Sequence, residues 1–299
     1  MTRTVHTPIL TREILALLEL SPGDRTIDAT MDGGGHTRAL LDATAPSGRV
    51  LGIDRDPELI ALARERFAAE ISAGRLLLAQ GSFAELASIA AQHGFAEVAA
   101  VLFDLGASSF HFDIAGRGFS FRQNEPLDMR FDPSDSSRPT AAELVNRLDA
   151  RELARLIARY GEERHAARIA RELMRRRPVS TTHELYAGIE AALPAPVRWR
   201  AARSAARVFQ ALRIAVNDEL AALETALPQA FSLLRPGGKL AVLSFHSLED
   251  RIVKHFFQSE QKRGAARILT KKPVRPSEEE VRANPRAASA KLRVCERLR

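Results

Sequence analysis

Cysteine is almost absent from this 299-residue sequence, which contains Cys295 alone. A single cysteine excludes an internal disulfide and a multi-cysteine zinc cluster. No apolar run reaches the ~18 residues that a membrane-spanning helix needs, and the N-terminal segment "MTRTVHTPILTREIL" lacks the apolar core of a secretory signal. We therefore expect a cytoplasmic protein with no membrane partner.

Lysine is also scarce where the positive charge is densest. Between Arg151 and Arg213 there are 14 Arg and 6 Glu but no Lys or Asp. That stretch carries a net charge of +8, so the rest of the chain, whose total is +7, sums to −1. A basic excess of this kind suits a polyanionic partner such as nucleic acid. The alternative is a biased composition that leaves solvated arginines on helix faces.

Apolar runs alternate with helical patterns through the first hundred residues and again near the C-terminus. Near-continuous apolar strands separated by helices predict an α/β fold with a mostly parallel sheet covered on both faces. One helix should start at Asp56 with Pro57 in its first turn, and another at Ser247 with Asp250 in the capping-box position. The expected strands are 25–30, 48–56, 75–83, 98–106, 239–246, 266–271 and 291–298.

The alternation breaks after the fourth expected strand. A long segment rich in Gly, Pro, Ser and Asp follows, and the residues from 140 to about 206 have only helical patterns, including one long pattern over 150–177. We interpret this as a helical insertion. The predicted organisation is a first part of the α/β domain over 1–110, a helical insertion over 111–206, and a second part over 207–299.

The stretch "DATMDGGGHT" places three glycines, Gly33 to Gly35, where the first strand turns into a helix. Glycines here let a ligand approach the backbone at the carboxyl edge of the sheet, although a tight turn without a ligand fits as well. The nicotinamide fingerprint is not met, because Arg38 stands where its last glycine would be, and no lysine completes a P-loop. Asp54 ends the second strand at the spacing from which an acidic side chain binds a ribose hydroxyl.

Two further strand ends carry candidate residues. Phe83 ends the third strand and could lie against an adenine or pack in the core. Asp104 ends the fourth strand, where a carboxylate could hydrogen-bond and align an exocyclic amine for methyl transfer by positioning and electrostatics. Methylation at cytosine C5 would instead need a cysteine nucleophile, and Cys295, in the last expected strand, is poorly placed for that role.

Five segments taken together give the sequence a family resemblance. They resemble, in order, motifs of the RsmH (MraW) family of small-subunit ribosomal RNA cytosine-N4 methyltransferases, and the resemblance spans 6–299, from "HTPIL" to "KLRVCERL". It implies a Rossmann-like class I methyltransferase fold with a seven-stranded, mostly parallel sheet and an inserted helical domain, 111–206, that would recognise RNA. The segments are "DGGGHT", "FDLGASS", "RGFSFRQNEPLDMR", "RVFQALRIAVNDEL" and "LSFHSLEDRIVK".

The resemblance also implies the chemistry. The methyl donor would be S-adenosylmethionine and the acceptor a cytosine in the decoding region of small-subunit rRNA, within the small ribosomal subunit or an assembly intermediate. No metal is implied, and the oligomeric state is left open, a homodimer included. Asp104 would also be the catalytic residue. The cofactor contacts would fall on Gly34, Gly35, His36, Asp54, Phe83, Asp104 and His111.

The sequence departs from the family pattern at two places. His111, in "SSFHFD", replaces a cofactor-contacting Gln of the usual "SSPQLD". Met31 and Asp32, in "TMDGGGH", replace an aromatic and a small residue of the usual "TFGRGGH". An added carboxylate beside a cationic sulfonium is electrostatically tolerable, so we expect cofactor binding to survive.

Other residues admit two interpretations each. His246 could be a general base by its side-chain type, or a histidine that fixes its loop by hydrogen bonds. Arg117, Arg122 and Arg130 in the long loop could contact phosphates or be solvated. The run from Arg175 to Arg177 could hold the RNA backbone or end a solvated helix.

Two functions from other classes compete with an rRNA methyltransferase. A DNA amino-methyltransferase would resemble sequences that carry a D/S/N-P-P-Y motif, which is absent here because Asp104 is followed by Leu105, Gly106 and Ala107. A non-catalytic RNA-binding protein with a relic cofactor site is the second alternative. It would show no thermal shift with S-adenosylmethionine.

Overall fold

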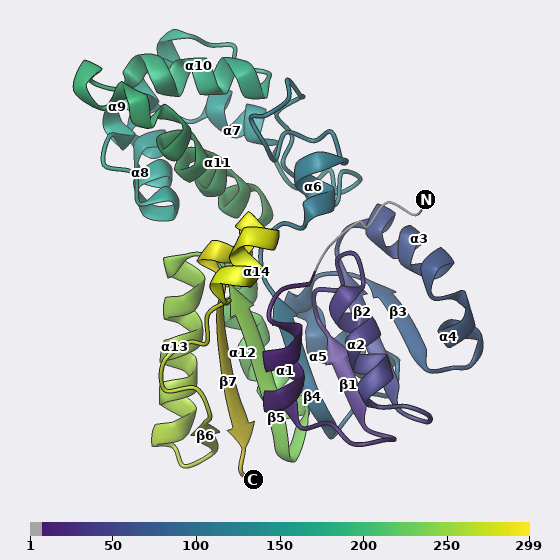
Figure 1. Cartoon of the computed structure of the whole chain (residues 1–299). Coiled ribbons are helices and arrows are strands. Elements are labelled where there is room, and N and C mark those ends of the chain that lie inside the picture. The colour runs from purple at the N-terminus through teal and green to yellow at the C-terminus, as the bar shows by residue number, and fades with distance from the viewer. Residues whose placement is uncertain (1–7) are drawn as a thin grey trace. The chain divides into compact units, whose positions relative to one another are not determined.

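The computed structural model describes residues 8–299, so His6 and Thr7 of the "HTPIL" motif lie outside the described residues. The chain forms two compact units (Figure 1). One contains Met1–Ser108 and Leu220–Arg299, and the other contains Ser109–Glu219. In the described part of the chain, none of the helices combines the length and the apolar character required to cross a membrane.

The first unit is built on one seven-stranded sheet with the order β3-β2-β1-β4-β5-β7-β6. Strands β1 to β5 pair in parallel, and β7 runs antiparallel to both β5 and β6. The expected α/β class and mostly parallel sheet are therefore confirmed. The strands are β1 (Arg25–Asp28), β2 (Arg49–Asp54), β3 (Leu76–Gln80), β4 (Val98–Asp104), β5 (Leu234–Ser244), β6 (Ala266–Ile268) and β7 (Lys291–Arg297).

Helices cover both faces of this sheet (Figure 1). One face packs buried side chains against α5 (Leu86–Gln92), α12 (Glu219–Leu233) and α13 (Ser247–Lys262). The other face packs against α1 (Thr11–Leu18), α2 (Gly35–Ala43) and α3 (Pro57–Arg66). Shorter helical segments are α4 (Ala68–Ser72), η1 (Phe83–Glu85), α14 (Glu278–Ala283) and η3 (Pro285–Ser289).

The caps of two helices test the sequence expectations. Asp56 accepts the backbone N–H of Glu58, and Pro57 is the first residue of α3, as predicted. The predicted cap of α13 is wrong by one residue, because His246 and not Ser247 is the N-cap. His246 has extended backbone angles, φ −137° and ψ 168°, which a residue entering a helix needs, and its imidazole replaces the hydroxyl that we expected to accept the hydrogen bond.

The second unit is helical. Its elements are α6 (Ser109–Asp113), α7 (Ala141–Arg147), α8 (Ala150–Gly161), α9 (Ala166–Arg175), α10 (Thr182–Ala192), η2 (Ala195–Arg200) and α11 (Ala201–Asn217). The single helix predicted over 150–177 is in fact two, because α8 ends in a left-handed residue, Glu162, with φ 49°.

The helical unit extends beyond the residue where we expected it to end. The predicted boundary at 206 falls inside α11, and the compact unit continues to Glu219. Gly161, the last residue of α8, lets α11 pack closely against that helix. A Cβ on Gly161 would lie 2.5 Å from the carbonyl oxygen of Arg207 in α11. Contacts of this kind cannot be seen in the local pattern from which the boundary was predicted.

Candidate active site

Three aspartates lie at the carboxyl ends of neighbouring parallel strands. Asp28 ends β1, Asp54 ends β2 and Asp104 ends β4, and β1 lies between the other two strands in the sheet. All three residues are buried. The strand order reverses at β1, where open α/β sheets bind ligands outside the carboxyl ends of their strands.

Asp54 fastens the glycine turn to the sheet. Its carboxylate accepts the backbone N–H of Asp32 at 2.7 Å and that of Asp56 at 2.8 Å. Burial raises the pKa of Asp54 to about 7, although these two hydrogen bonds act in the opposite direction. A carboxylate has about four acceptor positions, so two bonds leave capacity for hydroxyl groups of a ligand.

The glycines of the turn are required by packing within the protein. Gly34 has φ +73°, and a Cβ on it would lie 2.5 Å from the ring of Phe67. A Cβ on Gly35 would lie 2.8 Å from Pro8. Helix α2 begins at Gly35, and no side chain among the described residues caps it. Its first backbone N–H groups therefore suit a hydrogen-bond acceptor from a ligand.

Asp104 is held from two directions. Its backbone N–H donates to the hydroxyl oxygen of Thr30 at 2.6 Å, and its carboxylate lies 3.5 Å from Nε2 of the buried His36. Burial lowers the pKa of His36, but the nearby Asp104 carboxylate outweighs burial, so the net shift is upward. Neither imidazole nitrogen of His36 forms a hydrogen bond among residues 8–299, so Nε2 contacts Asp104 only as an ion pair.

Two carboxylates of the edge were not recognised as site residues from the sequence. Asp28 accepts the hydroxyl of Thr37 at 2.7 Å, and burial raises its pKa to about 6. Asp32 has φ +48°, and burial followed by the charges of Asp54 and Asp104 raises its pKa well above the usual range. Asp28 could have been found from its position at a strand end. Asp32 was noted only as a departure from a pattern.

The two aromatic residues predicted to contact the cofactor lie in different units. Phe83 begins η1, is half-buried and packs edge-on against Phe103 with ring centroids 5.6 Å apart. His111 lies in α6 of the helical unit, where it is buried beside Phe119 and Phe131 at ring-centroid distances of 5.0 and 4.9 Å. Of the predicted site residues, Gly34, Gly35, His36, Asp54, Phe83 and Asp104 belong to the sheet unit.

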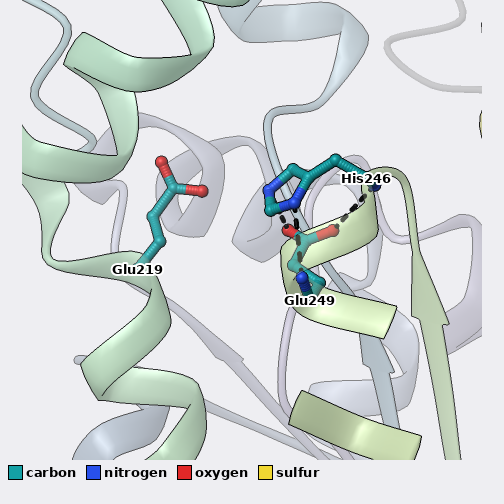
Figure 2. A group of neighbouring side chains, drawn as sticks. All are labelled: Glu219, His246 and Glu249. Carbon is teal, nitrogen blue, oxygen red and sulfur yellow. Dashed lines mark hydrogen bonds and ion pairs between the residues drawn. The ribbon is translucent and has the colours of Figure 1, made fainter. Parts of the chain in front are cut away.

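His246 has a structural role (Figure 2). Nδ1 of its imidazole accepts the backbone N–H of Glu249 at 3.3 Å, and Nε2 lies 3.1 Å from the Glu249 carboxylate. That carboxylate in turn accepts the backbone N–H of Phe245 at 2.9 Å. Glu219, also drawn in Figure 2, forms a bidentate ion pair with Arg213 in the helical unit. The loop-fixing interpretation of His246 thus has direct support.

Cys295 lies in β7, where it is fully buried, and burial raises the pKa of its thiol. A buried, protonated thiol is a poor nucleophile.

Most of the arginines singled out in the sequence have partners inside the protein. Arg117 donates to the carbonyl oxygens of Arg130 and Phe131 at 3.0 and 2.7 Å, and Arg130 pairs through two nitrogens with Asp128. These contacts hold the long loop together, whereas Arg122 is exposed.

The three consecutive arginines at the end of α9 also have partners within the protein. Arg175 and Arg176 both pair with Glu172, and Arg177 donates to the carbonyl oxygens of Val145 and Leu148. Glu172 compensates part of this charge, and the hypothesis that the run holds RNA stays a prediction.

The chemistry of the edge of the sheet identifies the class of protein. Buried carboxylates with raised pKa values favour a cationic ligand, and Asp54 and the uncapped start of α2 offer acceptors and donors for hydroxyl and carboxylate groups. S-adenosylmethionine, a sulfonium with a ribose and an amino-acid group, has these features, so the residues present fit it. A sheet of this strand order with such an edge is that of a class I methyltransferase, and the chain is one.

More narrowly, the chain belongs to the MraW methylase family, whose sequence model matches residues 3–298. Membership implies S-adenosylmethionine as the methyl donor. The chain is 49% identical to the ribosomal RNA small subunit methyltransferase H of Thermomicrobium roseum, over 99% of this chain and 94% of that protein. The protein of the same name from Syntrophotalea carbinolica is 46% identical over the whole of both chains. That from Heliobacterium modesticaldum is 45% identical, over 98% and 99%.

Proposed function

We propose that this protein transfers a methyl group from S-adenosylmethionine to the exocyclic N4 of a cytosine in the decoding region of small-subunit rRNA. One observation carries the proposal: relatives 45–49% identical over nearly the whole chain are named small-subunit rRNA methyltransferases. The substrate is the rRNA within the small ribosomal subunit or an assembly intermediate, and the protein acts in the cytoplasm.

The cofactor is held by the strand ends of the sheet unit. Asp54 accepts hydrogen bonds from the ribose hydroxyls, and Phe83 lies against the adenine. The backbone at Gly34, Gly35 and His36 binds the amino-acid end through the free start of α2. Support comes from the strand-end position of Asp54 and the uncapped helix. The contact that the family resemblance assigns to His111 stays a prediction.

Asp104 aligns the acceptor. The cofactor supplies a methyl group activated by its positively charged sulfur. The lone pair of a cytosine amino group is delocalised into its ring, so the enzyme must hydrogen-bond the N–H groups and orient the nitrogen. The Asp104 carboxylate can do so, and Thr30 and His36 fix its position. No covalent nucleophile is needed, which agrees with the burial of Cys295.

Nucleoside analysis by mass spectrometry tests the proposal. Small-subunit rRNA from cells without the gene should lack one N4-methylated cytidine, and a plasmid copy should restore it. An unchanged nucleoside profile would contradict the proposed substrate. Calorimetry with S-adenosylmethionine separates this outcome from the relic-site alternative, because a protein with a relic site would not bind the cofactor.

A further inference from the structure

A cleft of about 230 Å³ lies entirely within the helical unit, where η2 and the start of α11 meet the turn between α8 and α9. Its lining includes one carboxylate and an unusual number of cationic or titratable nitrogens. The residues concerned are Glu163, Arg164, His165, Arg200, Arg203 and Arg207. Arg200, Arg203 and Arg207 follow one another at helical spacings of three and four residues, so they share one face.

Two of the arginines that line this cleft have no partner among the described residues. Arg164 and Arg203 are exposed and form no hydrogen bond or ion pair with the described residues. Arg175 and Arg176, by contrast, share the carboxylate of Glu172. Like charges in excess of their counter-charges repel one another, and an anion bound between them relieves that repulsion.

Glu163 explains how the cleft is organised. Its buried carboxylate accepts the backbone N–H of His165 at 2.9 Å and lies 3.5 Å from a guanidinium nitrogen of the partly buried Arg207. The carboxylate therefore fixes Arg207 and neutralises one charge, which leaves Arg164, Arg200 and Arg203 in excess.

An exposed aromatic ring adjoins the same cleft. Trp199, the only tryptophan of the chain, is 75% exposed, more than the other large hydrophobic side chains that the structure describes as exposed. The guanidinium of Arg200, which lines the cleft, lies 4.5 Å from the centroid of the Trp199 ring. An exposed ring beside a cationic groove is the arrangement on which proteins stack the bases of single-stranded nucleic acid.

We propose that this cleft holds a backbone phosphate of single-stranded RNA while an adjoining base stacks on Trp199. The class of partner rests on the proposed function. The contact itself rests on the unpaired guanidinium groups and the exposed indole. Duplex RNA fits less well, because its bases are stacked on one another and cannot cover the ring.

Binding of a fluorescent single-stranded RNA dodecamer of mixed sequence to the full-length protein tests the site. Replacing Arg164 and Arg203 together by alanine should lower affinity about tenfold or more. It should also reduce the slope of log K against log salt by about 0.7, the value for one phosphate of a single strand. The matched control is the double variant Arg175→Ala and Arg176→Ala, which removes two charges from the same unit and should change both quantities much less.

Trp199 is tested separately. Trp199→Ala should weaken binding about fivefold or more, as expected for one stacked base, and Trp199→Phe should restore most of the loss. A duplex of the same length should show no Trp199 effect. Equal affinities and salt slopes for the two arginine double variants would overturn the phosphate site. Equal binding by Trp199→Ala and the native protein would overturn the stacking contact.

The proposed function can fail independently of this site. Methylation of small-subunit particles by the native protein is measured in parallel, and cofactor affinity is measured for every variant. If the native protein methylates no cytosine while the arginine and tryptophan effects on RNA binding persist, the proposed reaction fails and the RNA site stands. If the native protein methylates the cytosine but the arginine and tryptophan variants bind RNA like the native protein, the proposed reaction stands and the RNA site is overturned.

Discussion

Asp32→Asn should make the cofactor-free protein more stable, and the gain should grow with pH. Burial raises the pKa of Asp32, and the nearby charges of Asp54, Asp104 and Asp28 raise it further. A carboxyl group whose pKa is higher in the folded than in the unfolded protein favours folding when it is protonated. That contribution is complete below about pH 4 and is lost as pH rises through the folded-state pKa.

The magnitude follows from the same linkage. Each unit by which the folded-state pKa exceeds the unfolded value removes about 1.4 kcal/mol at high pH. For a domain the size of the sheet unit, every 1 kcal/mol corresponds to roughly 2–4 °C in Tm. Asparagine keeps the oxygen that accepts the hydrogen bond from Ser108 and tolerates the left-handed backbone, φ +48°, so the variant changes mainly the charge.

Thermal unfolding monitored by circular dichroism between pH 4.5 and 8.5 is the assay. The Tm of Asp32→Asn should approach that of the native protein at the acid end and exceed it increasingly toward pH 8.5. Asp32→Gly serves as a second variant, since it also relieves a left-handed conformation worth about 1 kcal/mol. Equal Tm values for the native protein and Asp32→Asn at pH 8.5 would refute the inference that the carboxylates at this edge of the sheet repel one another in the folded protein.

Three further predictions concern the site. Asp54→Ala should lower the affinity for S-adenosylmethionine about tenfold or more, because a hydrogen bond to a charged group contributes roughly 1.5–3 kcal/mol; unchanged affinity by calorimetry would refute the ribose contact. Asp104→Ala should slow methyl transfer severely, and saturating cofactor should not rescue the rate if the residue aligns the acceptor. Native kinetics would exclude both a cofactor contact and a role in aligning the acceptor. His246→Asn should retain methyl transfer, because asparagine also caps helices, whereas His246→Ala should cost about 1 kcal/mol of stability. An inactive, folded His246→Asn would instead favour the general-base interpretation.

Much of the fold was determined by local sequence. Apolar runs located the parallel strands because a strand buried on both faces must be apolar along its length, and Asp56 with Pro57 fixed the start of α3 because both residues act within one turn. Asp54 and Asp104 could be located for the same reason, since a polar residue that ends a buried parallel strand must reach the carboxyl edge of the sheet.

Long-range packing decided the rest. Only the tertiary structure shows that Gly34 and Gly35 accommodate Phe67 and Pro8, and that α11 belongs to the helical unit. It also separates the arginines that are paired, such as Arg175, from those left unpaired at the cleft beside Trp199. The sequence determines which residues carry charge, but the partner of each charge depends on chain segments brought together by folding, and that pairing decides which charges remain available to bind a ligand.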